Sequence, residues 1–158
     1  MKMNKLQRKD FFVFDDESIK RWPGHVFSGI NLVYSCEDTH IRFLNLLTLK
    51  TDLIQLGSSI GLGADIKRLV PTTPLNFKRT TDRPKRIREL GRGEHFAWSK
   101  DSKHNNSIAL ALFNGGSNMR IINLDSVFIW KRYFNSSDLS AEVYPVKLTH
   151  KLKFRTIK

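Results

Sequence analysis

The chain has 158 residues, and its 27 Lys and Arg against 15 Asp and Glu give a formal net charge of +12. Its hydrophobic content of 40% is enough for a folded core, and no run approaches the ~18 consecutive apolar residues of a membrane span. A single cysteine, Cys36, excludes an internal disulfide framework and cysteine-rich zinc sites, so we expect a reducing compartment: the cytoplasm or nucleoid, or a host cytoplasm if the protein is viral.

The positive charge is gathered in three segments. Residues 1–9, 65–92 and 146–158 together hold eighteen of the 27 Lys and Arg residues, whereas 10–64 and 93–145 are neutral or slightly acidic. We interpret the three as a basic arm, a connector and a basic C-terminal strand. Clustered cations attract polyanions because binding releases condensed counterions. A merely soluble surface does not require this segregation, so the pattern favours nucleic acid as the partner.

The first half of the chain predicts short strands. FFVF at 11–14 is a β-type run, and RWPG at 21–24 is a turn. Residues 25–35 and 41–46 are rich in β-branched and aromatic residues and flank a polar turn at 36–39.

The segment that follows is ambiguous. Residues 49–56 could form a further strand, but 39–56 also fits a helix capped by Asp38 and ended at Gly57. Periodicity does not separate the two alternatives.

An internal repeat bears on this choice. INLVYSCEDTHIRFLNL at 30–46 aligns without a gap to IALALFNGGSNMRIINL at 108–124. The second copy has NGGSN between two apolar runs, a hairpin signal because glycine accepts a positive φ. If the copies are related, residues 40–46 form a strand.

The second half continues in the same style. EHFAW at 94–98 predicts a strand, 99–106 a polar loop and 127–133 a further strand. FAWSKD, SIALALFNGG and NMRIINLDSVFIW are similar to the SH3-like barrels of the Tudor and KOW type. The resemblance implies a mainly β fold with two small SH3-like units in tandem, at 10–64 and 93–145.

The aromatic residues of the second unit have three possible roles. The resemblance implies a cage for methylated lysine or arginine, whereas general chemistry also allows base stacking or a place in the core. Core packing is favoured overall, and Trp98, beside a polar loop, is the candidate for stacking. The residues concerned are Phe96, Trp98, Phe113, Phe128 and Trp130.

The connector and the tail are expected outside the two units. Three prolines in 71–84 predict a linker, and 83–90 could form a short basic helix. Residues 146–158 alternate apolar and cationic side chains, which predicts one strand with a cationic face. The same lysines would also protect an edge strand from aggregation.

The sequence therefore predicts a protein that binds nucleic acid, double-stranded DNA in preference to RNA, by neutralising phosphates with little sequence preference. The predicted site residues are Lys67, Arg68, Lys78, Arg79, Arg83, Lys85, Arg86, Arg88, Arg92, Lys147, Lys151, Lys153 and Arg155, with Trp98 for stacking. The arm adds Lys2, Lys5, Arg8 and Lys9. A viral or nucleoid-associated accessory protein would fit these properties, and the oligomeric state stays open.

Two other functions compete with this prediction. One is a protein–protein module that docks on the transcription machinery. The other is a small nuclease, but its candidate groups match no metal or catalytic spacing, so we expect no enzyme, cofactor, metal or membrane partner. Those groups are Glu94, His95, Asp101 and His104, with Cys36, Asp38 and His40 in the first repeat.

Overall fold

A computed structural model shows a mainly β protein, which confirms the predicted fold class. The structure describes residues 1–23, 28–48, 50–73, 77–91, 93–98, 108–111, 121–123, 128–129, 140–149 and 152–157. Within these ranges, no helix is long and apolar enough to cross a membrane. The chain forms two compact units: Met1–Thr73 with Lys153–Lys158 make unit 1, and Pro74–Leu152 make unit 2.

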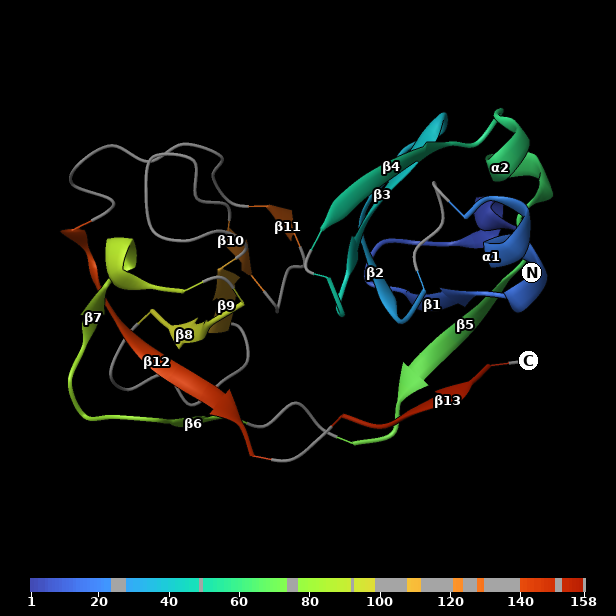
Figure 1. Ribbon diagram of the computed structural model, residues 1–158. Coiled ribbons are helices and arrows are strands. Elements are labelled where there is room, and N and C mark those ends of the chain that lie inside the picture. The colour runs from blue at the N-terminus through green and yellow to red at the C-terminus, as the bar shows by residue number, and fades with distance from the viewer. Residues whose placement is uncertain are drawn as a thin grey trace. The chain divides into compact units, whose positions relative to one another are not determined.

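Unit 1 is an antiparallel sheet of six strands in the order β13-β5-β1-β2-β3-β4, curled into a half-barrel (Figure 1). Its elements are the 3-10 helix η1 (Met3–Lys5), β1 (Phe11–Phe14), α1 (Asp16–Arg21), β2 (Asn31–Cys36), β3 (His40–Asn45), β4 (Thr51–Gln55), α2 (Ser59–Gly63), β5 (Ile66–Pro71) and β13 (Phe154–Thr156).

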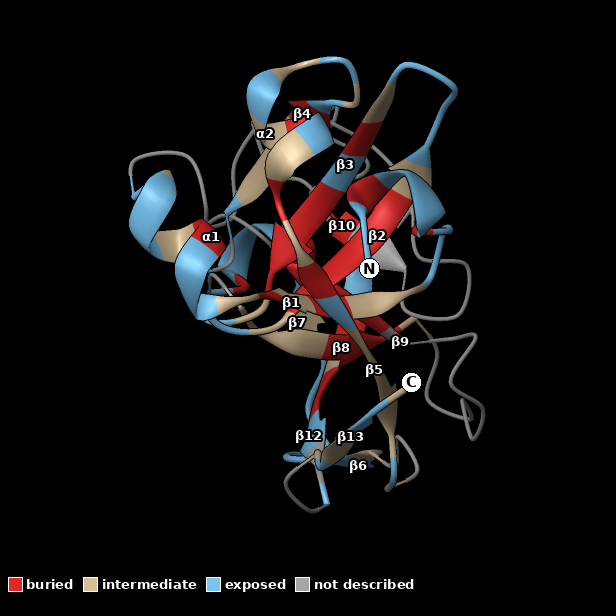
Figure 2. Ribbon diagram, turned by 90° about the vertical axis from the view of Figure 1, so that its right-hand side faces the viewer, coloured by how far each residue is buried: buried red, intermediate tan, exposed pale blue. Residues whose placement is uncertain are grey.

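The core of unit 1 lies inside the curl of the sheet. Phe12 and Phe43 pack edge to face with ring centroids 5.4 Å apart, and Phe14 contacts both rings. Buried residues follow the strands, whereas α1 and α2 are largely exposed (Figure 2). Each short helix is capped by its preceding residue: Asp15 accepts from Ser18 N at 2.8 Å and Ser58 from Gly61 N at 3.1 Å.

Unit 2 has the same sheet order in its own strands, β6-β12-β8-β9-β10-β11, with β7 also paired to β12. Its elements are β6 (Phe77–Arg79), β7 (Lys85–Arg86), the 3-10 helix η2 (Ile87–Glu89), β8 (His95–Ala97), β9 (Ile108–Ala111), β10 (Ile121–Asn123), β11 (Phe128–Ile129) and β12 (Glu142–Leu148). Its core contains Phe96 of β8 with Ile87 and Leu90, which pack against buried residues of β9 and β10.

The sequence repeat occupies the same hairpin in both sheets, β2–β3 in unit 1 and β9–β10 in unit 2. The paired residues are Asn31 with Asn45, Leu32 with Leu44 and Val33 with Phe43 in the first hairpin, and Ala109 with Asn123, Leu110 with Ile122 and Ala111 with Ile121 in the second. These pairs match position for position in the ungapped alignment. Because a slip of one residue would move every side chain to the other face, the shared register is a specific likeness.

The likeness extends to the segment that enters each sheet, residues 1–14 and 85–98. In unit 1, Lys9 donates its backbone N–H to Val33 O at 2.8 Å, and in unit 2 Gly93 donates to Ala111 O at 2.6 Å. Both donors lie in the left-handed region, with φ of 77° for Lys9 and 81° for Gly93. A non-glycine residue rarely takes this conformation, so Lys9 is held in it by the surrounding structure, whereas Gly93 adopts it without strain.

The last strand of each half is exchanged between the units. β6 follows β5 in the chain but pairs with β12 of unit 2, and β13 follows β12 but pairs with β5 of unit 1 (Figure 1). The predicted boundaries are therefore wrong for the connector 65–92 and the tail 146–158. The connector contributes β5, β6 and β7 to the two sheets, and the tail contributes the end of β12 and the whole of β13. The predicted single strand over 146–158 is two strands in different units.

Other local predictions have mixed outcomes. The helix alternative for 39–56 is wrong, because β3 and β4 form an antiparallel ladder there. The basic helix at 83–90 is a short strand followed by one 3-10 turn, and α1 was not predicted. The NGGSN turn and the polar loop at 99–106 lie outside the described residues.

If β13 is part of unit 1, Phe154→Ala should loosen that unit. The ring of Phe154 lies 5.2 Å from that of Phe11, and its loss should cost about 1–2 kcal/mol, less than the ~3 kcal/mol of full burial. Hydrogen exchange followed by mass spectrometry should show faster exchange in β1 and β5 but unchanged exchange in β8. Phe77→Ala is the matched control, because the ring of Phe77 contacts His95 on β8. This variant should speed exchange in β8 and leave exchange in β1 and β5 unchanged. Equal loosening of both units by either variant would contradict the exchanged arrangement.

Candidate nucleic-acid interface

Seven of the predicted cations lie along one edge of unit 2. β6 and β7 run along the same side of β12, and residues 80–84 connect them (Figure 1). The backbone N–H of Thr80 continues the ladder by donating to Pro145 O at 3.0 Å. The cations on this edge are Lys78, Arg79, Arg83, Lys85, Arg86, Arg88 and Lys147. Sequence proximity placed the first six together, but only the pairing of β6 with β12 adds Lys147.

Three of these seven have a side-chain partner within the unit. Lys85 forms an ion pair with Glu94 at 3.1 Å, and Arg79 approaches Asp82 at 3.9 Å and the ring of Tyr144 at 5.9 Å. Arg88 donates to the Ser140 hydroxyl. The ion pairs of Lys85 and Arg79 reduce the charge available to a ligand, whereas the hydrogen bond orients Arg88 and leaves its charge in place.

The other four, Lys78, Arg83, Arg86 and Lys147, are exposed and have no ion pair among the described residues. Lys78 and Lys147 are direct partners across β6 and β12. Like charges directly opposite each other on a sheet destabilise the strand pair. The edge of unit 2 therefore concentrates positive charge that its own described carboxylates do not neutralise.

The corresponding edge of unit 1 carries Lys67 and Arg68 on β5, Arg155 on β13, and Lys153 just before it. Lys67, Lys153 and Arg155 are exposed. Arg68 shares the core-side face with Phe12, its partner on β1, and its guanidinium lies 3.8 Å from Asp10. The ion pair with Asp10 directs Arg68 at its own unit.

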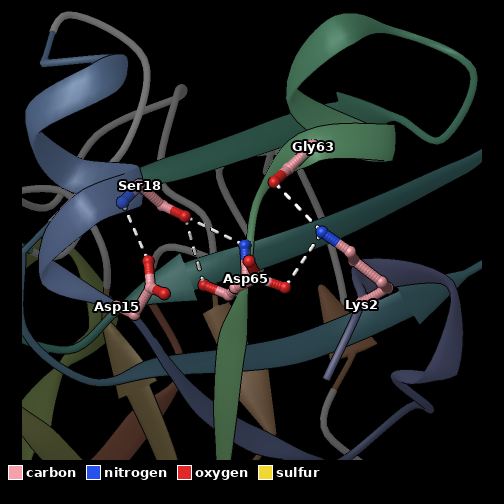
Figure 3. A network of polar contacts seen from close by, with 5 residues as sticks. All are labelled: Lys2, Asp15, Ser18, Gly63 and Asp65. Carbon is pink, nitrogen blue, oxygen red and sulfur yellow. Dashed lines mark hydrogen bonds and ion pairs between the residues drawn. The ribbon is translucent and has the colours of Figure 1, made fainter.

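The predicted basic arm is folded into unit 1, so it is not a free segment. Met3 and Leu6 are buried in the core, and Lys2 forms a backbone bridge with Asp65. In Figure 3, the ammonium group of Lys2 reaches the Asp65 carboxylate at 2.9 Å and the Gly63 carbonyl at 3.3 Å. Lys5, Arg8 and Lys9 are exposed.

The same network fixes α1 against β5. Ser18 Oγ accepts from the Asp65 N–H at 2.9 Å (Figure 3). Hydrogen bonds from Ser18, with a smaller contribution from the charges of Lys67 and Lys2, hold the pKa of Asp15 below its usual value. Asp65, the residue before β5, is therefore joined to α1 through the buried Ser18 and to the N-terminal residues through Lys2.

Trp98 packs against the core of unit 2. It is half-buried, and its ring meets that of Phe96 edge to face at 5.0 Å. This favours the core interpretation over base stacking. Trp22, the other tryptophan that the structure describes, lies in the segment predicted as a turn. Its ring lies 4.6 Å from the Arg21 guanidinium, and both residues line a shallow cavity of about 450 Å³. In the sequence, the adjacent Arg–Trp pair was the signal for this contact.

The nuclease candidates that the structure describes have local contacts. Glu94 accepts from Lys85 and from Gly91 N–H at 2.9 Å, and the thiol of Cys36 lies 3.3 Å from Leu6 O. Burial raises the pKa of Cys36 and lowers that of His95. No cluster of metal-ligating side chains occurs within the described ranges. Asp101 and His104 lie outside those ranges, as do the predicted site residues Arg92 and Lys151.

Comparison of the chain with protein-family models, curated proteins and solved structures finds no match.

Replacing one of the facing lysines should stabilise the free protein. Lys147→Glu converts a like-charge pair with Lys78 into an opposite-charge pair, so the free energy of unfolding should rise by about 0.5–1 kcal/mol. Urea denaturation at low salt measures this, and the gain should shrink at 1 M salt because the charges are screened. Lys50→Glu, at an exposed position away from this edge, is the control. An equal gain in both variants would show a general effect of net charge.

Burial of His95 should make stability depend on pH. Its pKa is lowered in the folded state, so the unfolded chain binds the proton more readily. Stability should fall as the pH drops below about 6.5, the ordinary histidine value, and level off below the folded pKa. His95→Phe, which copies Phe11 of unit 1, should remove this part of the pH dependence. The difference between the two denaturation series measures it, and parallel series would contradict the assignment.

Proposed function

We propose that this protein binds nucleic acid, double-stranded DNA with little sequence preference, through the cationic edges of its two sheets. The observation that carries the proposal is the pair Lys78 and Lys147. Two exposed lysines stand directly opposite each other on neighbouring strands without an ion pair in the described part of the chain. Such a pair is costly in the free protein and favourable when a phosphate lies between the two ammonium groups.

The chemistry of these edges suits the nucleic-acid backbone. Lysine and arginine neutralise phosphates, and the release of counterions supplies the free energy at every sequence. Phosphate contacts fix the position of a protein on the duplex but carry no sequence information. Binding of this kind is expected to be strong at low salt, weak at high salt and similar on unrelated sequences.

We also assign both units to the SH3-like barrels of the Tudor and KOW type. Short antiparallel strands, tight turns and a curled half-barrel sheet support this class. A role as a viral or nucleoid-associated accessory protein follows from the small size and the high positive charge, and docking on transcription machinery is compatible with it.

The salt dependence of binding tests the proposal. With six to ten phosphates engaged, affinity for a long duplex should fall by roughly 10³–10⁵-fold between 50 and 200 mM salt. Replacing Arg83, Arg86 and Arg88 by alanine should weaken binding about equally on unrelated sequences and reduce the slope of log K against log salt by up to about 2.7. Fluorescence anisotropy with labelled duplexes gives both quantities.

The control is a variant with the same loss of charge elsewhere, in which Lys20, Arg42 and Lys50 are replaced by alanine. Its slope should stay near that of the unaltered protein. An unchanged slope in the arginine variant would remove these residues from the mechanism. Absence of binding to duplex DNA, single strands and duplex RNA at 50 mM salt would reject the function, and cleavage that requires Mg²⁺ would favour the nuclease.

A further inference from the structure

The two cationic edges are equivalent structures. Each ends in an exchanged strand that starts with phenylalanine followed by a cation, Phe77-Lys78 in β6 and Phe154-Arg155 in β13. The two phenylalanine rings have equivalent partners, each one strand beyond the paired strand. The ring of Phe77 lies 5.4 Å from that of His95 on β8, and the ring of Phe154 lies 5.2 Å from that of Phe11 on β1.

The backbone leaves both edges through the same hydrogen bond. In unit 2, Thr80 N–H donates to Pro145 O at 3.0 Å, and in unit 1 Ile157 N–H donates to Arg68 O at 2.9 Å. Each edge is therefore built by the same ladder onto a sheet that has its own core.

Both edges carry cations that are available to a ligand. Those that are exposed and have no side-chain partner among the described residues are Lys78, Arg83, Arg86 and Lys147 in unit 2, and Lys67, Lys153 and Arg155 in unit 1. The opposed pair of Lys78 and Lys147 has no counterpart in unit 1, where Val70 lies opposite Arg155. Two cationic edges with the same backbone construction are expected to take the same kind of ligand.

We propose that the protein has two separate phosphate-backbone sites, one on each sheet edge, so that one chain binds two short duplexes. This inference rests on the proposed function and adds the number of sites and their location. Four cations at the edge of unit 2 and three at that of unit 1 imply losses of affinity of about 150-fold and about 40-fold between 50 and 200 mM salt. A duplex that contacted both edges would show a steeper salt dependence than either site alone.

Isothermal titration calorimetry of the full chain with a duplex of about ten base pairs at low salt counts the sites directly. The unaltered protein should bind two duplexes. Alanine at Lys78, Arg83, Arg86 and Lys147 should leave one site, and alanine at Lys67, Lys153 and Arg155 should also leave one. A variant with all seven changes should bind none. The control with Lys20, Arg42 and Lys50 replaced by alanine should still bind two.

A charge-conserving variant separates charge from folding: with K78R, R83K, R86K and K147R together, the protein should still bind two duplexes. Circular dichroism and thermal unfolding check that each variant keeps its sheets. Binding of one duplex by the unaltered protein, weakened by either set of changes, would show that both edges share a single duplex; it would overturn this inference and leave the proposed function intact. No binding by the unaltered protein would overturn the proposed function itself.

Discussion

The hydrogen-bonded ladders at the two sheet edges are the constraint on which the rest of the structure depends. Without β13, the edge of β5 would leave backbone N–H and C=O groups unpaired, and without β6 the edge of β12 would do the same. Each half of the chain fills the edge left by the other. Lys153 marks one end of this exchange: its carbonyl accepts from Thr72 N–H at 2.7 Å, and its N–H donates to Thr73 Oγ1 at 3.1 Å.

This constraint also decides where the charge lies. Arg155 would be part of a mobile tail if the tail were free, but pairing of β13 with β5 gives it a fixed place on a sheet edge. Edge strands commonly carry lysines that discourage pairing with other chains. Here the same positions concentrate positive charge, so protection of the edge and binding of phosphates can be served by the same residues.

The internal duplication persists in geometry more than in residue identity. Asp10 and Glu94 occupy matching positions, and each carboxylate accepts from the backbone three residues earlier, Gln7 N at 2.8 Å and Gly91 N at 2.9 Å. The left-handed turn beside them is kept with lysine in one copy and glycine in the other. Core positions such as Phe12 and Phe96 are fully buried in both units. What is shared is the set of positions that fix the path of the backbone.

Local patterns in the sequence determined the β-rich class, the strand at 11–14, the hairpin register of the repeat and the grouping of cations, because side-chain alternation, turn residues and charge act over a few positions. The helix-or-strand ambiguity at 39–56 was settled by pairing between β3 and β4. The tertiary structure alone decided that the connector and the tail complete the sheets, that Lys147 faces Lys78, and that Lys2 and Arg68 are engaged by Asp65 and Asp10. Those contacts join residues far apart in the chain, and the choice of partner for an open strand edge depends on which backbone groups remain unpaired after both halves have folded.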